Sequence, residues 1–155
     1  LASPGFWKDE LNKEIKDNQI RKKKIFATAN GANKNAINEV LKRPEVVSAL
    51  RLDRVVQELN LIEELMGEIK KDGLFAYGIK EVKQAANMGA IKSLAVTDSL
   101  IIKTREQNKF NDIENIMKNV DNSQGEVHII SSDHEGGKIL DGLGGIAGLL
   151  RYKIQ

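Results

Sequence analysis

The C-terminal segment SSDHEGGKILDGLGGIAGLLRYKIQ holds the side chains best suited to chemistry. Ser131 and Ser132 precede Asp133, His134 and Glu135, which places hydroxyls, an imidazole and carboxylates side by side. A hydrolytic triad needs its members to meet in space through the base, and metal ligands are spaced by three or four residues on helices and by two on strands. Consecutive residues do not easily meet either condition, because His134 would face away from its two neighbours in an extended segment. We therefore expect a solvated loop from a strand to a helix.

The glycines of the same segment suggest a nucleotide loop, Gly142-Leu-Gly144-Gly145-Ile-Ala-Gly148. The dinucleotide fingerprint places glycines at positions one, three and six, and it follows a strand and opens a helix. Here the sixth position is Ala147, and the pattern follows a predicted helix and opens a predicted strand. Gly142, Gly144 and Gly145 are predicted instead to end a helix and turn the chain sharply. At least one of the last two should have positive φ.

Two further features allow a functional and a plain structural interpretation. The basic run Arg21-Lys22-Lys23-Lys24 could contact RNA phosphates, and it could equally be a solvated linker. His128 lies in the middle of a predicted strand, where a core or cross-strand role is the default.

Composition narrows the class of protein. The 155 residues are 41% hydrophobic and 30% charged with a net charge of +2, which is typical of a globular protein and does not by itself indicate nucleic-acid binding. No apolar stretch approaches the roughly 20 residues of a membrane span, and the chain has no cysteine for disulfides or thiolate metal sites. We expect a cytoplasmic monomer with no membrane partner.

The elements divide at about residue 45. Ser3 and Pro4 are predicted as the N-cap and first residue of a helix, and residues 25–29 as a short strand followed by a helix that ends before Pro44. One strand with two helices has no sheet to join, so residues 1–45 are predicted to be the C-terminal part of a truncated domain.

Residues 46–155 have a self-sufficient pattern. A long helix is predicted over residues 53–71, then strands alternate with helices, which predicts a three-layer α/β/α domain. The segment DSLIIKTREQNKFND is expected to connect a strand to a helix that starts near residue 113. The long helix carries an apolar stripe of Val55, Leu59, Ile62, Met66 and Ile69.

Four segments in order along the chain resemble the Pelota family, the ribosome-rescue relatives of the class-one release factors. They are ASPGFWKDEL, GANKNAINEVLKRPEV, FAYGIKEVKQAANMGAIKSLAVTDSLI and GEVHIISSDHEGGKILDGLGGIAGLLRY. The lysine-rich sequence looks archaeal. The resemblance implies the end of a ribonuclease-H-like central domain, followed by a whole C-terminal domain that resembles the kink-turn-binding ribosomal-protein fold.

The resemblance also implies a role in no-go and non-stop mRNA surveillance. Family members enter stalled ribosomes with an elongation-factor-like GTPase and promote recycling with an ATP-binding-cassette ATPase. Pro4-Gly5-Phe6 matches the family motif that contacts the GTPase, and Phe6 is expected to pack on the core behind it. The mRNA and rRNA surface is the remaining expected partner.

Two alternatives stay open. Release factors share the closing glycine-rich signature, but they typically insert a small module after the strand that here ends near Thr97. A divalent-metal-dependent endoribonuclease activity is ascribed to the family and assigned to an N-terminal domain outside this sequence. For these residues we expect no catalysis, no cofactor and no metal.

Overall fold

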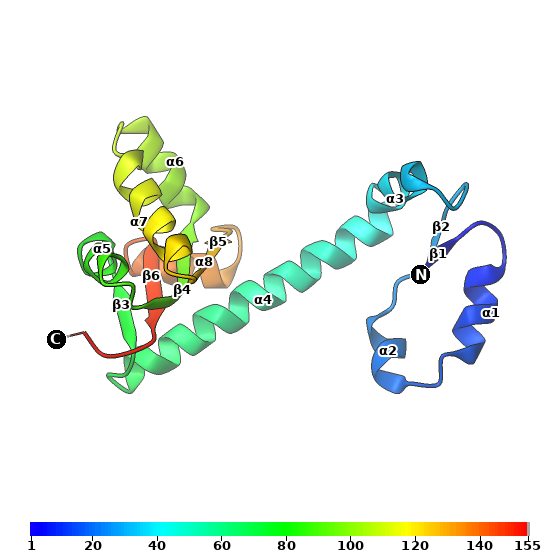
Figure 1. Cartoon of the computed structure of the whole chain (residues 1–155), viewed down its shortest axis with the longest axis horizontal. Coiled ribbons are helices and arrows are strands. Elements are labelled where there is room, and N and C mark those ends of the chain that lie inside the picture. The colour runs from blue at the N-terminus through cyan, green and yellow to red at the C-terminus, as the bar shows by residue number, and fades with distance from the viewer. Residues whose placement is uncertain (155) are drawn as a thin grey trace. The chain divides into compact units, whose positions relative to one another are not determined.

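A computed structural model describes residues 1–154, with the side chains of residues 21–23 also outside the description. The chain divides into two compact units, Leu1–Arg54 and a second that begins at Val55 (Figure 1). Each unit has its own secondary structure, so each is described by itself.

The first unit contains very little regular sheet. Strands β1 and β2 pair in parallel through two residues each, with Ala2 opposite Ala27 and Ser3 opposite Thr28. Helix α2 was not predicted; the Asp17 side chain caps it by accepting a hydrogen bond of 2.7 Å from the Gln19 amide. The elements are β1 (Ala2–Ser3), α1 (Trp7–Glu14), α2 (Asn18–Lys23), β2 (Ala27–Thr28) and α3 (Lys34–Leu41).

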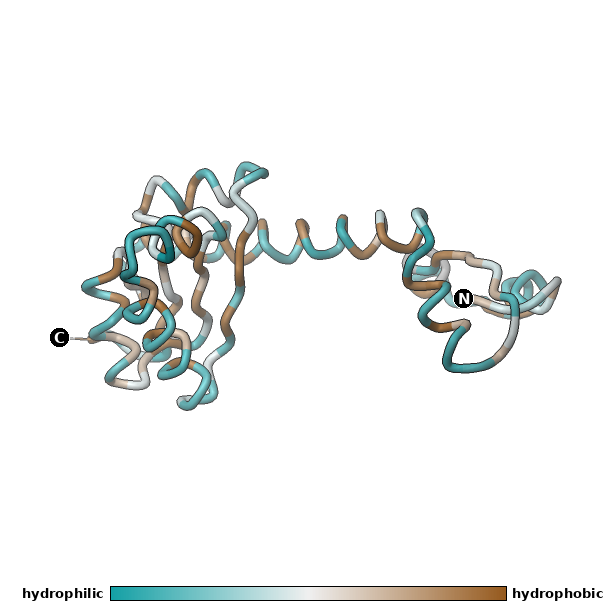
Figure 2. Tube along the Cα trace, turned by 90° about the horizontal axis from the view of Figure 1, so that it is seen from above, coloured by the Kyte–Doolittle hydropathy of each residue, from teal (hydrophilic) through white to brown (hydrophobic). Residues whose placement is uncertain are grey.

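Helix α4 (Pro44–Lys70) begins nine residues before the predicted start at residue 53. The prediction took Pro44 as a helix breaker, but proline has no amide hydrogen to lose at the first position of a helix. The amides of Val46 and Val47 both donate to the Arg43 carbonyl, at 3.0 and 2.9 Å, which starts the helix there. The predicted division between residues 45 and 46 therefore falls inside the first turn of α4. Hydrophobic and polar residues alternate along the helix (Figure 2).

A four-stranded mixed sheet forms the centre of the second unit. Its strand order is β3-β6-β4-β5, with β4 parallel to β5 and with β6 antiparallel to both β3 and β4. The strands are β3 (Phe75–Tyr77), β4 (Ile91–Thr97), β5 (Glu126–Ile130) and β6 (Ile146–Leu150). The helices that follow α4 are α5 (Ile79–Asn87), α6 (Asp98–Glu106), α7 (Phe110–Asn122) and α8 (Glu135–Gly142).

Helices cover both faces of this sheet, as the predicted three-layer α/β/α architecture requires. On one face Leu94 and Val96 of β4 pack with α5 and α7, and on the other Ala95 packs with α4 and α8. Successive strand residues face opposite sides, so one strand contributes to both layers of core. Buried residues of the first face include Val82, Ala85, Ile113, Ile116 and Val120, and those of the second include Ile62, Leu65, Ile130 and Leu140.

Helix α6 corrects the expectation of a connecting segment after β4. Thr97 ends the strand and caps the helix, because its side chain accepts a hydrogen bond of 3.2 Å from the Leu100 amide. Helix α7 then begins at Phe110, earlier than the predicted residue 113. The guanidinium of Arg105 in α6 lies over the Phe110 ring, 4.5 Å from its centroid. This cation–π contact joins the end of α6 to the start of α7.

The apolar stripe of α4 does face the sheet, but its centre is shifted. Ile62 is fully buried, whereas Val55, Leu59, Met66 and Ile69 are half-buried. Leu65, absent from the predicted stripe, is 2% exposed. The helix thus presents a neighbouring row of residues to the core, because a periodic pattern fixes a face only to within about one residue.

The glycine-rich turn between α8 and β6 has the predicted conformation. Gly144 and Gly145 have φ of 95° and 78°, and Gly142 is the last residue of α8. A Cβ on Gly145 would lie 2.8 Å from the Leu100 Cβ and 2.9 Å from the Thr97 hydroxyl. Both backbone conformation and space therefore require glycine at this position, and neither requirement involves a ligand.

Candidate functional site

The turn Pro4-Gly5-Phe6 connects β1 to α1 in the first unit. The helix begins at Trp7, so the prediction of Ser3 as N-cap and Pro4 as first helical residue is wrong. Phe6 is the N-cap, and Ser3 instead accepts a hydrogen bond of 2.9 Å from the Lys8 amide through its hydroxyl. The strand β1 includes Ser3, which leaves three residues for the turn that follows it.

This turn is exposed, and its backbone is restricted at Pro4, whose ring fixes its own φ. Gly5 has a φ of 63° with open space where a Cβ would lie. Phe6 is 83% exposed and Trp7 is 72% exposed. The expected packing of Phe6 on a core is therefore wrong, because a turn that enters the helix this late directs both rings to the surface.

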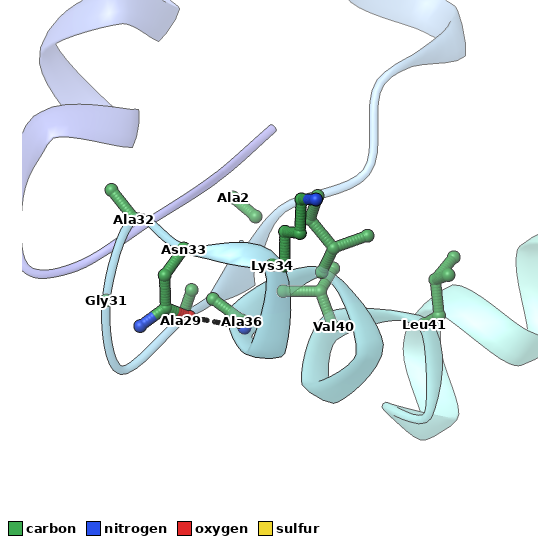
Figure 3. Close-up of a pocket in the computed structure, with 10 residues that line it drawn as sticks. Ala2, Ala29, Gly31, Ala32, Asn33, Lys34, Ala36, Val40 and Leu41 are labelled. Atoms are coloured by element: carbon green, nitrogen blue, oxygen red, sulfur yellow. Dashed lines mark hydrogen bonds between the residues drawn. The ribbon is translucent and has the colours of Figure 1, made fainter.

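An apolar hollow of about 510 Å³ lies in the same unit as the turn (Figure 3). Asn33 stands at its rim and caps α3 by accepting a hydrogen bond of 2.9 Å from the Ala36 amide, drawn as a dashed line in Figure 3. Its other polar side chain is Lys34, and the rest of the lining is mainly apolar. The residues that line it include Ala2, Ala29, Ala36, Ile37, Val40 and Leu41.

The basic run lies mainly on helix α2. Arg21, Lys22 and Lys23 have side chains outside the described residues, so their contact with RNA stays a prediction. Lys24 donates through Nζ to Asn12 Oδ1 and lies over the Phe26 ring, 5.4 Å from its centroid. These contacts hold the one described ammonium of the run within its own unit.

His134 is fixed by groups that the sequence did not bring together. Its Nε2 lies 2.6 Å from Oε2 of Glu58 on α4, 76 residues away, and its Nδ1 accepts a hydrogen bond of 3.4 Å from the Gly137 amide. His134 is thus the N-cap of α8, and neither ring nitrogen is left for Ser131 or Ser132. The geometry of a serine hydrolase is absent from these residues, and Glu58 was missed because nothing local marks it.

The carboxylates that flank His134 lie in the loop and at the first residue of α8. Asp133 and Glu135 are exposed, and β5 ends before them at Ile130. His128 is half-buried within β5, with Nε2 3.3 Å from Oε2 of Glu126 on the same strand. In the described part of the chain, no three His, Asp or Glu side chains group so as to hold a metal ion.

A second polar cluster lies where the parallel strands β4 and β5 end. Asp98 accepts a hydrogen bond of 3.0 Å from the Ser132 amide, and Asp141 accepts one of 2.6 Å from the Ser99 hydroxyl. The Ser132 hydroxyl lies close enough to help both carboxylates, although it makes no hydrogen bond of good geometry. Polar residues after two neighbouring parallel strands could have indicated this cluster, since such strand ends meet at one edge.

The two carboxylates of this cluster favour their charged form. Burial raises the pKa of Asp98, but hydrogen bonds from the Ser132 and Ser99 backbone amides, together with the nearby Ser132 hydroxyl, outweigh it, so the pKa is lowered. Burial likewise raises the pKa of Asp141, and the side chains of Ser99, Thr97 and Ser132 lower it below the usual value. The cluster therefore ties α6 and α8 to the end of the sheet.

The sequence model of the family described as eRF1 domain 3 matches residues 55–154, which is almost all of the second unit. The chain belongs to the eRF1 domain 3 family. None of the described helices combines the length and apolarity needed to cross a bilayer.

Within this family the chain is similar to Pelota along its whole length, which confirms the predicted resemblance. It is 40% identical to the Pyrococcus furiosus protein pelota homolog over 158 residues, covering 100% of this chain and 43% of that protein. The chain thus spans less than half the length of this relative.

Solved structures agree with the sequence comparison. A model of ribosome-bound archaeal Pelota and ABCE1 matches with a TM-score of 0.71 and 34% identity, over 99% of this chain and 43% of that one. Saccharomyces cerevisiae Dom34 matches with a TM-score of 0.64 and 30% identity, over 99% and 46%. That protein is described as a translation termination-like factor that is involved in RNA quality control pathways and interacts with Hbs1.

Proposed function

We propose that this chain is part of a ribosome-rescue factor that acts in translation quality control. The observation that carries the proposal is the match of 99% of the chain to archaeal Pelota in a ribosome-bound assembly with ABCE1. We propose the ribosome, an elongation-factor-like GTPase and an ATP-binding-cassette ATPase as partners of the longer protein, in the cytoplasm where ribosomes work. Dom34, with its partner Hbs1, supports the proposal of a second protein partner.

We place the GTPase contact at Pro4-Gly5-Phe6. The ring of Pro4 fixes its φ, so this exposed residue loses little backbone entropy when a partner binds the turn. The neighbouring rings of Phe6 and Trp7 supply exposed aromatic area, the kind of side chain that dominates interface energies. This chain acts in our proposal by binding and cleaves no RNA.

Binding and rescue should be measured separately. In titration calorimetry with the GTPase, the full-length protein with Pro4→Ala and Gly5→Ser should bind about 1–3 kcal/mol more weakly than the parent. Phe6→Ala should weaken binding by a similar amount, because its ring is exposed at the turn. Lys13→Ala on the same exposed helix is the matched control and should bind as the parent does.

Release of stalled ribosomes in a reconstituted system tests the function itself. The parent should split them with its partners, and the turn variants should do so more slowly. Equal GTPase affinity in all variants would remove the turn from the interface while the rescue function stands. A parent protein that neither binds nor releases stalled ribosomes, but releases peptide at stop codons, would favour a release factor.

A further inference from the structure

Glu58 is the one charged residue that the described part of the chain buries. Its exposed fraction is 7%, and it lies on α4 three residues after the second unit begins at Val55. A carboxylate is costly to remove from water unless charged or hydrogen-bonding groups compensate it. A residue of this kind at this point therefore needs a specific structural reason.

Two groups from the loop between β5 and α8 meet this carboxylate. The Ser131 amide donates to Oε2 at 3.0 Å, and His134 Nε2 lies 2.6 Å from the same oxygen. The Gly137 amide can only donate, so Nδ1 of His134 is its acceptor and Nε2 carries the ring hydrogen toward Glu58. One side chain of α4 thus fixes both the loop and the histidine that caps α8.

Two glycines let the loop and the start of α8 pack closely against each other and against α4. A Cβ on Gly137 would lie 2.0 Å from the Ser131 carbonyl oxygen, and a Cβ on Gly136 would lie 3.2 Å from Leu59 Cδ2. The apolar contacts between α4 and the sheet face involve residues from Leu61 to Ile69. Glu58 therefore attaches α4 one turn before that apolar contact begins.

We propose that Glu58, Ser131 and His134 form an anchor that clamps the first turn of α4 in the second unit to the start of α8. The anchor sets where α4 stops being held by this unit, so any bending or fraying of the helix arises on the N-terminal side of Glu58. Hydrophobic contact alone permits small slides along a helix, whereas a buried hydrogen-bonded carboxylate has one position in which its bonds are made. This proposal does not depend on the proposed function.

Hydrogen–deuterium exchange of the 155-residue chain tests the anchor. In His134→Asn, the asparagine can still cap α8 but its side chain is too short to reach Glu58. The variant therefore removes the contact with Glu58 and keeps the helix cap. We expect amides of residues 55–61 to exchange about ten- to a hundredfold faster than in the parent, while amides of β4 and β6 keep their rates. Glu63→Gln, on the exposed face of the same helix, should leave all rates unchanged.

Glu58→Gln shows whether His134 acts through Glu58. The amide oxygen still accepts from Ser131, and no charge is left buried when His134 is lost. His134→Asn should therefore accelerate exchange less in the Glu58→Gln background than in the parent. Unchanged exchange in residues 55–61, uniform acceleration of the whole unit, or an equal effect of His134→Asn in both backgrounds would each overturn the anchor.

Discussion

The two units of the chain bury very different side chains. In the first unit the described buried hydrophobic residues are Ala27, Ala29 and Ala36, each of which removes little apolar area from water. In the second unit branched side chains on both faces of a four-stranded sheet are fully buried, among them Ile62, Leu94, Ile116 and Leu140. The second unit has a core of its own, whereas the first has secondary structure without one.

The first unit, which buries only alanines among its described hydrophobic residues, exposes several large apolar side chains. It exposes Phe6 and Trp7 at the start of α1, and Ile37 and Leu41 in the lining of an apolar hollow. Apolar side chains grouped on a surface are typical of regions that another segment or another protein covers. The comparison indicates that residues after Val55 carry most of the stability, and that the first unit depends on contacts beyond those within these residues.

The largest expected effect on stability is at a buried leucine of α4, compared with an exposed leucine of the same helix. Leu65→Ala removes a fully packed side chain and should lower the free energy of unfolding by about 2–5 kcal/mol. Leu50→Ala, in the first unit and 54% exposed, should change it by less than about 0.5 kcal/mol. Urea denaturation followed by circular dichroism measures both, and equal losses would contradict the division of stability between the units.

Glycines at positive φ make a second comparison. Gly145→Ala combines a left-handed conformation with contacts under 3 Å to Leu100 and Thr97, and should cost about 2–4 kcal/mol. Gly5→Ala meets open space, so only the conformational cost of about 1–2 kcal/mol remains. Thermal denaturation of the two variants should rank them in this order, and the reverse order would show that the turn before β6 can rearrange.

Acid should act mainly on the second unit. The folded-state pKa of Asp98 is lowered below 3.8, so its carboxylate stabilises the fold above that pH, and the contribution is lost as pH falls through the folded value. Asp98→Asn should therefore be less stable than the parent at pH 7, and the difference should shrink in more acidic buffer. The exposed Asp133→Asn is the control. A difference between Asp98→Asn and the parent that stays constant with pH would show that the Asp98 charge is not responsible.

The smallest effect on stability is expected at Phe6. Because the ring is 83% exposed, Phe6→Ala should leave the melting temperature of the 155-residue chain within about 2 °C of the parent. A clear loss of stability would mean that the ring packs within its own unit, and it would disqualify Phe6→Ala as a probe of partner binding.

Local patterns in the sequence determined most elements of the second unit. Alternation of helical and strand periods predicted its three layers, and Gly144 and Gly145 marked the turn into β6, because these signals arise within one or two turns of chain. Where predictions were wrong, a residue had two local uses. Pro44 can end a helix or start one. The Ser3 hydroxyl can accept from an amide of the first turn of α1 without being the N-cap residue, as it does from Lys8.

Only the tertiary structure decided which polar groups meet. Glu58 belongs by sequence to an ordinary charged helix, and its burial against His134 depends on contacts across 76 residues. Asp98 and Asp141 likewise approach Ser132 and Ser99 because parallel strands end at a common edge. Periodicity reports which face of an element is apolar, but the pairing of polar side chains depends on the register between elements, and that register is fixed only when the layers pack.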